Sequence, residues 1–352
     1  MIKPLTSLRF FFAFFVFLSH LYFLEKEKNM EYIVKNLFSE GFLGVSFFFI
    51  LSGFILALNY REKFQNKTIS LRAFYIARFA RIYPLFFITM LAAVPFAYSG
   101  IKVLICNTFL LQSYIPYEKY FFSLNAPSWS ISDEMFFYAL FPFLIGITYK
   151  LGSFIKILLC FSFIFLIVIL NVTLAEDQAH YWLYISPFVR VFDFVLGILL
   201  LDFCLYLKKI KTDFNPKLFS LFEVSAFALL MIFFLCKDYV SISYRYSIYY
   251  WLPMCLIILT AANSFIFEKK ETFISNMLSR KWLVYLGEIS FGFYLIHYLV
   301  IFYMIRYDGF MGIHLEGLPL ACAMFIVTLI TSIFAFEKIE KPFNKKIKRL
   351  LS

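Results

Sequence analysis

Long apolar runs recur along the whole chain. A run of about 20 apolar residues is long enough to cross a bilayer as an α-helix. The pattern predicts ten such spans, at residues 5–24, 41–59, 82–99, 134–149, 154–174, 182–206, 218–236, 248–267, 284–305 and 318–336. The run at 103–115 is too short to span, so we expect a re-entrant or interfacial segment there. The expected fold class is an all-α polytopic integral membrane protein with about ten transmembrane helices.

The composition and the charge distribution agree with this class. The 352 residues are 62% hydrophobic and 16% charged, whereas a soluble domain carries about 25% charged residues. Of the 33 lysine and arginine residues, 23 fall inside and eight outside when the N-terminus is cytoplasmic. The positive-inside rule therefore predicts that both termini are cytoplasmic. This bias accounts for the net charge of +11, so we expect membrane lipids as partners and no nucleic acid.

Two regions are expected, a transmembrane domain at 1–337 and a basic cytoplasmic tail at 338–352 on the anionic inner leaflet. The first span lacks a small-residue cleavage site after it, so we expect a retained helix rather than a signal peptide. The six cysteines are scattered through apolar segments without metal-ligand spacing. We therefore interpret them as packing residues and expect no metal.

The first apolar run, RFFFAFFVFLSH at 9–20, carries an arginine at one end and a histidine at the other. On an α-helix, Arg9 and His20 would be separated by about three turns and about 16.5 Å of rise, on nearly the same face. Intramembrane charges usually face a bundle interior or a water-filled cavity. The structural alternative is that Arg9 snorkels to the inner headgroups and His20 to the outer ones.

Two other features favour helix packing. The segment GFLGVSFFFILSGF at 41–54 contains Gly44 and Gly53, and glycines allow helices to approach closely. Arg190 and Asp193 are three residues apart within the sixth predicted span, which places them on one face. A buried ion pair is the expected role of this pair.

The segment RFARIYP at 78–84 places Arg78 and Arg81 on one helix face, just before the third predicted span. Pro84 is suited to the first turn of that span, because proline disfavours helical geometry in the residue before it. The two arginines are either ordinary positive-inside charge or a phosphate site, since guanidinium groups match phosphate oxygens.

The segment PSWSISDEMFFYALFP at 127–142 places Glu134 at the outer end of the fourth predicted span. Ser132 is in a position to cap this helix, and Asp133 and Glu134 suit its positive N-terminal dipole. The functional alternative is that Glu134 orients or charges a histidine.

His297 lies in EISFGFYLIH at 288–297, toward the outer side of the ninth predicted span, with Tyr294 on the same face. A hydrogen-bonded structural histidine is one interpretation of His297. The predicted topology places acid–base groups in the outer half and arginines at the inner mouth, namely His20, Glu134 and His297 against Arg9, Arg78 and Arg81. Acyl-coenzyme A fits this arrangement, because it is a long donor with phosphates at one end and a reactive group at the other.

Taken together, these motifs resemble the membrane-bound acyltransferase-3 family, which O-acylates bacterial surface glycans. Five motifs in the family's order carry the resemblance: Arg9 with His20, GVSFFFILSGF at 44–54, RFARIYP at 78–84, WSISDEMFFYALFP at 129–142 and SFGFYLIH at 290–297. The resemblance implies an acetyl-CoA-dependent O-acyltransferase of the bacterial inner membrane. Its acceptor would be a surface polysaccharide such as lipopolysaccharide O-antigen, or a lipid-linked glycan. We expect a stand-alone form without a C-terminal esterase-like domain.

The resemblance also implies roles for the motif residues. His20 would be the general base or a transient acyl carrier, and Arg9 would support it or the donor. Arg78 and Arg81 would hold the phosphates of acyl-CoA, the co-substrate. The remaining matched residues are expected near the acceptor or the oxyanion: Glu134 as a catalytic assistant, Tyr294 and His297 as candidate hydrogen-bond donors, and Trp129, Ser132 and Asp133 as acceptor contacts.

A multi-span transporter or flippase of a glycolipid or small solute is the competing class. Ten spans with intramembrane arginine, aspartate and histidine also describe a carrier. A carrier would move its substrate without consuming acyl-CoA. A purely structural membrane subunit is disfavoured by the same ionisable groups.

Overall fold

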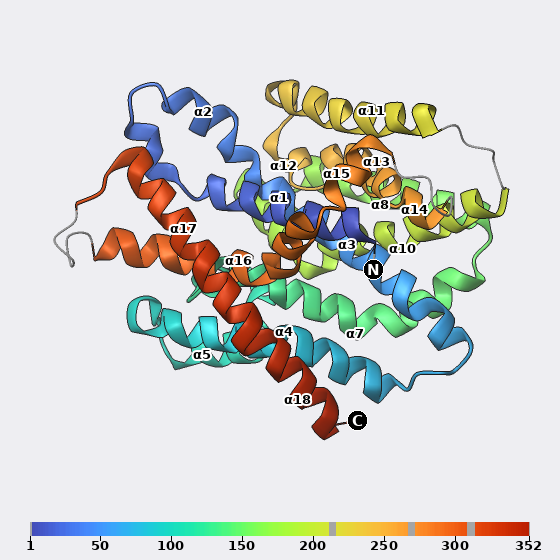
Figure 1. Cartoon of the computed structure of the whole chain (residues 1–352), viewed down its shortest axis with the longest axis horizontal. Helices are drawn as coiled ribbons and strands as arrows, with labels where there is room; N and C mark the ends of the chain where they lie inside the picture. Colours follow the sequence, from blue (N-terminus) through green and yellow to red (C-terminus); the bar gives the residue numbers. More distant parts are fainter. Residues whose placement is uncertain (1, 211–215, 267–271, 308–313, 352) are drawn as a thin grey trace. The chain divides into compact units, whose positions relative to one another are not determined.

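The computed structural model describes residues 2–210, 216–266, 272–307 and 314–351, and the regular structure within these ranges is entirely helical. Nine helices within these described ranges are long, and Figure 1 labels each of them. They are α1 (Lys3–Ser19), α3 (Leu43–Gln65), α4 (Leu71–Ala97), α7 (Trp129–Lys150), α8 (Ser153–Thr173), α10 (Pro187–Ile210), α11 (Pro216–Leu235), α16 (Lys281–Arg306) and α17 (Gly317–Ala335).

Shorter helices connect or extend the long ones. The α-helices among them are α2 (Glu31–Asn36), α5 (Ile101–Thr108), α6 (Glu118–Phe121), α9 (Glu176–His180), α12 (Ile242–Arg245), α13 (Trp251–Ala261), α14 (Asn263–Ile266), α15 (Phe273–Leu278) and α18 (Lys341–Leu351). The 3₁₀ turns are η1 (Tyr22–Lys26), η2 (Phe38–Phe42), η3 (Gln112–Tyr114), η4 (Ala126–Ser128), η6 (Lys237–Tyr239) and η7 (Ile248–Tyr250), and the π turns are η5 (Tyr181–Ile185) and η8 (Phe336–Glu340).

Seven helical segments of the described chain are long and apolar enough to cross a membrane, which confirms the all-α polytopic fold class. They are Glu31–Gln65, Leu71–Ala97, Ala126–Lys150, Ser153–Thr173, Lys217–Leu235, Lys281–Arg306 and Gly317–Ile347. The other three predicted spans fall on α1, which has 17 residues, on α13, which has 11, and on the charge-bearing α10. The count of ten and the orientation therefore remain predictions. α5, in the segment expected not to span, has only eight residues.

Two predicted helix boundaries are wrong. The third predicted span was expected to begin near residue 82 with Pro84 in its first turn, but α4 begins at Leu71 and runs through Pro84 and Pro95. Membrane helices tolerate internal proline where neighbouring groups satisfy the freed carbonyl. The fourth span begins earlier than Glu134, because η4, with Pro127 in its first turn, leads directly into α7 at Trp129. Ser132 therefore lies inside the helix, and its predicted capping role is wrong.

The chain divides into two compact units, and the first contains residues 1–9, 45–70 and 136–287. Within it, α3 and α10 touch through glycines: a methyl carbon built on Gly53 would lie 1.9 Å from the carbonyl oxygen of Phe194. This contact confirms the packing interpretation of Gly53. Arg190 and Asp193, both fully buried, form the predicted ion pair at 3.4 Å. The guanidinium of Arg190 also donates to Ser46 Oγ at 2.7 Å.

The second unit contains residues 10–44, 71–135 and 288–352. Its α4 and α16 lie side by side and run in the same direction, because contacts between them advance together along both helices. Arg81 lies over the ring of Phe291 at 5.8 Å, and farther along, the hydroxyl of Tyr303 donates to the carbonyl of Ala92 at 2.8 Å. The C-terminal α18 follows α17 through η8 and packs against α4 (Figure 1). The parallel pair α4 and α16 carries four of the predicted site residues, namely Arg78 and Arg81 on α4 and Tyr294 and His297 on α16.

Candidate functional site

Two histidines that are far apart in the sequence meet in the second unit. His20 directly follows the last residue of α1, and His297 lies within α16. His20 Nδ1 and His297 Nε2 are 3.3 Å apart, and the two ring centroids are 5.0 Å apart. His297 is fully buried, whereas His20 is only partly buried. The partly accessible His20 is therefore the member of the pair that a substrate can reach.

Backbone carbonyls determine which ring nitrogens of the pair carry protons. His297 Nδ1 lies 2.6 Å from the carbonyl oxygen of Tyr294, and His20 Nδ1 lies 2.8 Å from that of Val16. Because a carbonyl only accepts hydrogen bonds, each Nδ1 bears the proton. His297 Nε2 is then an acceptor facing His20 Nδ1–H. This assignment leaves His20 Nε2 unprotonated, as a general base requires.

The end of α1 places His20 outside the regular helix, which corrects the predicted helical geometry from Arg9 to His20. The backbone N–H of His20 donates to Phe17 at 3.1 Å, a tighter turn than an α-helix makes. Aromatic rings then surround the imidazole, with Tyr298 at 5.3 Å and Tyr22 at 6.3 Å between ring centroids. These contacts hold the ring in place at the edge of the unit's core.

The segment before α7 and the first turn of α7 hold α16, the helix that carries His297, in its position. Asn125 donates to the carbonyl of Leu295 at 2.8 Å. The hydroxyl of Tyr294 donates to the carbonyl of Pro127 at 3.1 Å and lies 2.8 Å from Ser130 Oγ. These bonds are buried, where hydrogen bonds are stronger than at a surface. Tyr294 thus ties the helix that carries His297 to the start of α7.

We expect Tyr294→Phe to lower the free energy of unfolding by about 1–3 kcal/mol, because it removes a buried hydroxyl from two hydrogen-bond partners. The measurement is the denaturation midpoint of the purified chain in detergent. Tyr307→Phe, at an exposed position directly after the end of the same helix, is the control and should change stability by less than about 0.5 kcal/mol. Equal stability of Y294F and the wild type would show that the hydrogen bonds of this hydroxyl do not stabilise the fold.

The first turns of α7 hold the other residues predicted near the acceptor. Trp129 is its first residue and is buried, and Ser132 Oγ donates to the carbonyl of Leu110 at 2.5 Å. Asp133 is fully buried, and Glu134 is partly buried. Burial, together with the charge of Asp133, raises the pKa of Tyr114 to about 12, so this phenol stays protonated at neutral pH. The roles of these residues toward an acceptor stay predictions.

Arg78 and Arg81 both lie on α4, as predicted, and both are partly buried. Arg81 Nη1 lies 3.5 Å from Glu340 Oε2, a nearly buried carboxylate in η8. Glu340 therefore holds the Arg81 side chain beside the C-terminal segment. Arg9 is a partly buried residue of α1 that belongs to the first unit.

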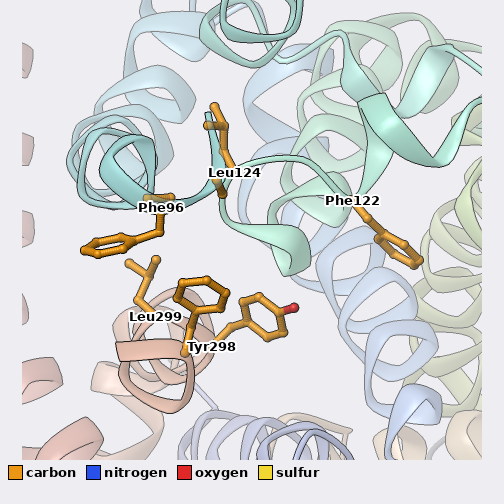
Figure 2. A pocket seen from close by; sticks show the side chains of 8 residues that line it. Phe96, Phe122, Leu124, Tyr298 and Leu299 are labelled. Carbon is orange, nitrogen blue, oxygen red and sulfur yellow. The ribbon is translucent and has the colours of Figure 1, made fainter. Parts of the chain in front are cut away.

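A cavity of about 210 Å³, lined mostly by apolar side chains, lies in the second unit (Figure 2). Eight residues from α4, α16 and the segment after α6 line it: Ala93, Phe96, Ala97, Phe122, Leu124, Tyr298, Leu299 and Phe302. Tyr298 belongs both to this wall and to the aromatic surroundings of His20. The cavity therefore lies next to the histidine pair.

The sequence predictions missed Tyr298, Glu340 and Asn125. Tyr298 follows His297 directly, and an aromatic residue among so many others gave no separate signal. Glu340 was visible as a carboxylate within a basic tail, a contrast that indicates a specific cationic partner. Asn125 donates a hydrogen bond to a backbone carbonyl. Every residue has such a carbonyl, so no sequence pattern indicates this partner.

The sequence of this chain is similar to the sequences of known acyltransferases. A family model described as an acyltransferase domain, Acyl_transf_3, matches residues 4–337. Acyltransferase MdmB of Streptomyces mycarofaciens is 28% identical over 334 residues, which cover 88% of this chain and 81% of MdmB. O-acetyltransferase OatA of Staphylococcus aureus is 26% identical over 335 residues, which cover 88% of this chain and 53% of OatA. The chain thus spans about half the length of OatA. No solved structure matches it.

Proposed function

Because the chain belongs to the acyltransferase-3 family, we propose that it transfers an acyl group from acyl-CoA to a hydroxyl group of a surface polysaccharide. Acetyl-CoA is the expected donor, and lipopolysaccharide O-antigen or a lipid-linked glycan is the expected acceptor. The protein would work in the bacterial inner membrane, with the donor entering from the cytoplasm. Relatives named acyltransferase and O-acetyltransferase support acyl transfer itself.

The histidine pair is the observation that supports this chemistry. In the proposed reaction, His20 Nε2 removes the proton of the acceptor hydroxyl as its oxygen attacks the thioester carbonyl. The tetrahedral intermediate then expels the thiolate of CoA, and the proton on His20 Nε2 passes to that sulfur. The products are the acyl ester and free CoA, and His20 returns to its starting form.

His297 would act through His20 rather than on the substrate. When His20 becomes an imidazolium ion, its Nδ1–H is a stronger donor toward Val16 O and His297 Nε2. This interaction stabilises the charged state that forms during proton transfer, and it keeps Nε2 directed away from the pair. His297 is therefore a positioning residue in this proposal.

We expect His297→Ala to lower the transfer rate about tenfold to 100-fold, because one of the two acceptors for His20 Nδ1–H is lost and only the carbonyl of Val16 remains. His297→Gln should recover part of this loss, because its side-chain oxygen still accepts a hydrogen bond. The readout is kcat and KM for acyl-CoA, and the effect should fall on kcat. An equal loss in both variants, or an effect on KM alone, would contradict the positioning role.

Along α4, a donor would extend from the arginines to the histidine pair. Arg81 lies at the level of Phe291 on α16, six residues before His297, or about 9 Å of helix rise. The guanidinium groups of Arg78 and Arg81 have the donor geometry that phosphate oxygens require. The pantetheine arm between the phosphates and the thioester is longer than this rise, so a donor with its phosphates at Arg81 would be long enough for its acyl end to reach His20.

Mass spectrometry of the surface polysaccharide tests this function directly. The polysaccharide is compared between an intact strain, a strain lacking the gene and the same strain with the gene restored. We expect an acyl-sized mass to disappear on deletion and to return on restoration, with an unchanged amount of polysaccharide. Equal masses with less polysaccharide at the surface would overturn acyl transfer in favour of transport.

A further inference from the structure

We infer that the cavity between α4 and α16 is the binding pocket for the acyl chain of the donor, and that it admits chains longer than acetyl. This inference rests on the proposed function. It adds a site to it, and it identifies the donor class as short and medium fatty acyl groups.

The position of the cavity relative to the other groups is the first argument. Contacts between the two parallel helices occur in the order Arg81 with Phe291, then Ala92 with Tyr303. The cavity-lining residues of α4 begin at Ala93, twelve residues beyond Arg81, which is about 18 Å of helix rise. His297 lies between these two levels on α16. An extended donor held by phosphates at Arg81 would thus reach the histidine pair first and the cavity last.

Contact with the catalytic histidine is the second argument. The ring of Tyr298 packs edge-on against the imidazole of His20, with ring centroids 5.3 Å apart, and the same side chain lines the cavity. Leu299, the next residue of α16, also lines it (Figure 2). A carbonyl carbon placed beside His20 would therefore have its alkyl substituent next to the cavity.

The third argument is the size and the chemistry of the cavity, which fit the acyl chain better than any other part of the donor or the acceptor. The side chains that line it are those of alanine, leucine and phenylalanine with one tyrosine, and polar atoms also contribute to its surface. An alkyl group fits these side chains better than a sugar does, because a sugar has many hydroxyl groups that need hydrogen-bond partners. Whole-ligand pockets usually measure about 300–1,000 Å³, so about 210 Å³ holds only part of a substrate. An apolar cavity of about 150 Å³ admits benzene, with six carbons. The pocket therefore has room for an acyl chain of about six carbons.

The test measures binding of CoA, acetyl-CoA, butyryl-CoA and hexanoyl-CoA to the purified full chain in lipid nanodiscs, without an acceptor. Each methylene buried in an apolar pocket strengthens binding by up to about fourfold. We expect butyryl-CoA to bind about tenfold more tightly than acetyl-CoA, and hexanoyl-CoA more tightly still. The increase beyond acetyl is the signature of the pocket.

Two variants change the pocket in opposite directions. Ala97→Phe fills it, so the gain from the longer chains over acetyl-CoA should disappear. Phe302→Ala enlarges it, so the gain should extend to octanoyl-CoA, which is measured in addition with this variant and with the wild type. Leu91→Phe is the matched control, because it adds a ring at an exposed position of the same helix outside the cavity wall. This control should leave every affinity unchanged.

The outcomes separate the pocket from the proposed function. If none of the four ligands binds, including CoA itself, the donor proposal fails and the pocket assignment fails with it. If CoA binds but chain length makes no difference in the wild type, A97F and F302A, the donor proposal stands and the pocket assignment is wrong. The assignment is also wrong if A97F alters only the phospholipid retained by the protein, because a lipid tail is then the occupant.

Discussion

Replacement of His20 with alanine is expected to lower acyl transfer by at least about 100-fold, the smallest contribution usual for a positioned general base. The imidazole is the partly accessible member of the pair, and its Nε2 is the nitrogen left without a proton. Its removal also leaves His297 Nε2 without a donor. His297, the other ring of the pair, is fully buried and therefore does not replace His20 as the general base.

The measurement is the acylated fraction of surface polysaccharide, obtained by mass spectrometry from a deletion strain that carries the H20A gene. The amount of the variant in the membrane fraction must equal that of the wild type. His180→Ala is the matched control, since His180 is a partly buried histidine of α9, in the other compact unit. Normal acylation by H20A would remove His20 from the mechanism. A loss of acylation in H180A of the same size would show that the assay reports folding.

A transient acyl-histidine is the alternative chemistry for the same residue. Incubation of the wild type with radiolabelled acetyl-CoA, without acceptor, separates the two routes. A label on the protein that H20A lacks would indicate an acyl carrier, whereas release of label only with acceptor would indicate a general base. Both routes require His20, so the expected loss in H20A is the same.

The sequence predicted the parts of the fold that depend on local composition. Apolar runs indicated the membrane helices, because burial in a bilayer requires that composition over a fixed length. The spacing of Arg190 and Asp193 predicted their ion pair, and the spacing of Arg78 and Arg81 predicted their common helix. These features arise within one helix, and so the sequence is sufficient for them.

Other features depend on contacts that local patterns do not contain. The start of α4 at Leu71 was missed, because positive charges before Pro84 resemble an exposed loop when neighbouring helices are ignored. The predicted topology placed His20 and His297 at similar depth, but their contact joins positions 277 residues apart. The turn that places His20 beyond the end of α1 was also missed. These features come from packing, which determines where each side chain lies.

The paired replacement Arg78→Gln and Arg81→Gln is expected to raise the Kd for CoA by at least about 100-fold. A hydrogen bond to a charged group contributes about 1.5–3 kcal/mol, so the loss of two such donors corresponds to a factor of that size. Glutamine keeps the length and helix preference of the side chains, which preserves α4. The loss should be largest at low salt, because screening weakens charge–phosphate attraction.

Binding of CoA to the purified chain, measured at two salt concentrations, provides the test. The matched control replaces Lys67 and Arg72 with glutamine, which removes the same charge from exposed positions in the same stretch of chain. If the control weakens binding as much as the test variant, the effect is that of a general positive surface. If neither variant weakens binding, the phosphates are held elsewhere. A selective loss in R78Q/R81Q, with acyl-chain discrimination by the cavity retained at high donor concentration, would assign the phosphates to these arginines and show that the two ends of the donor are recognised separately.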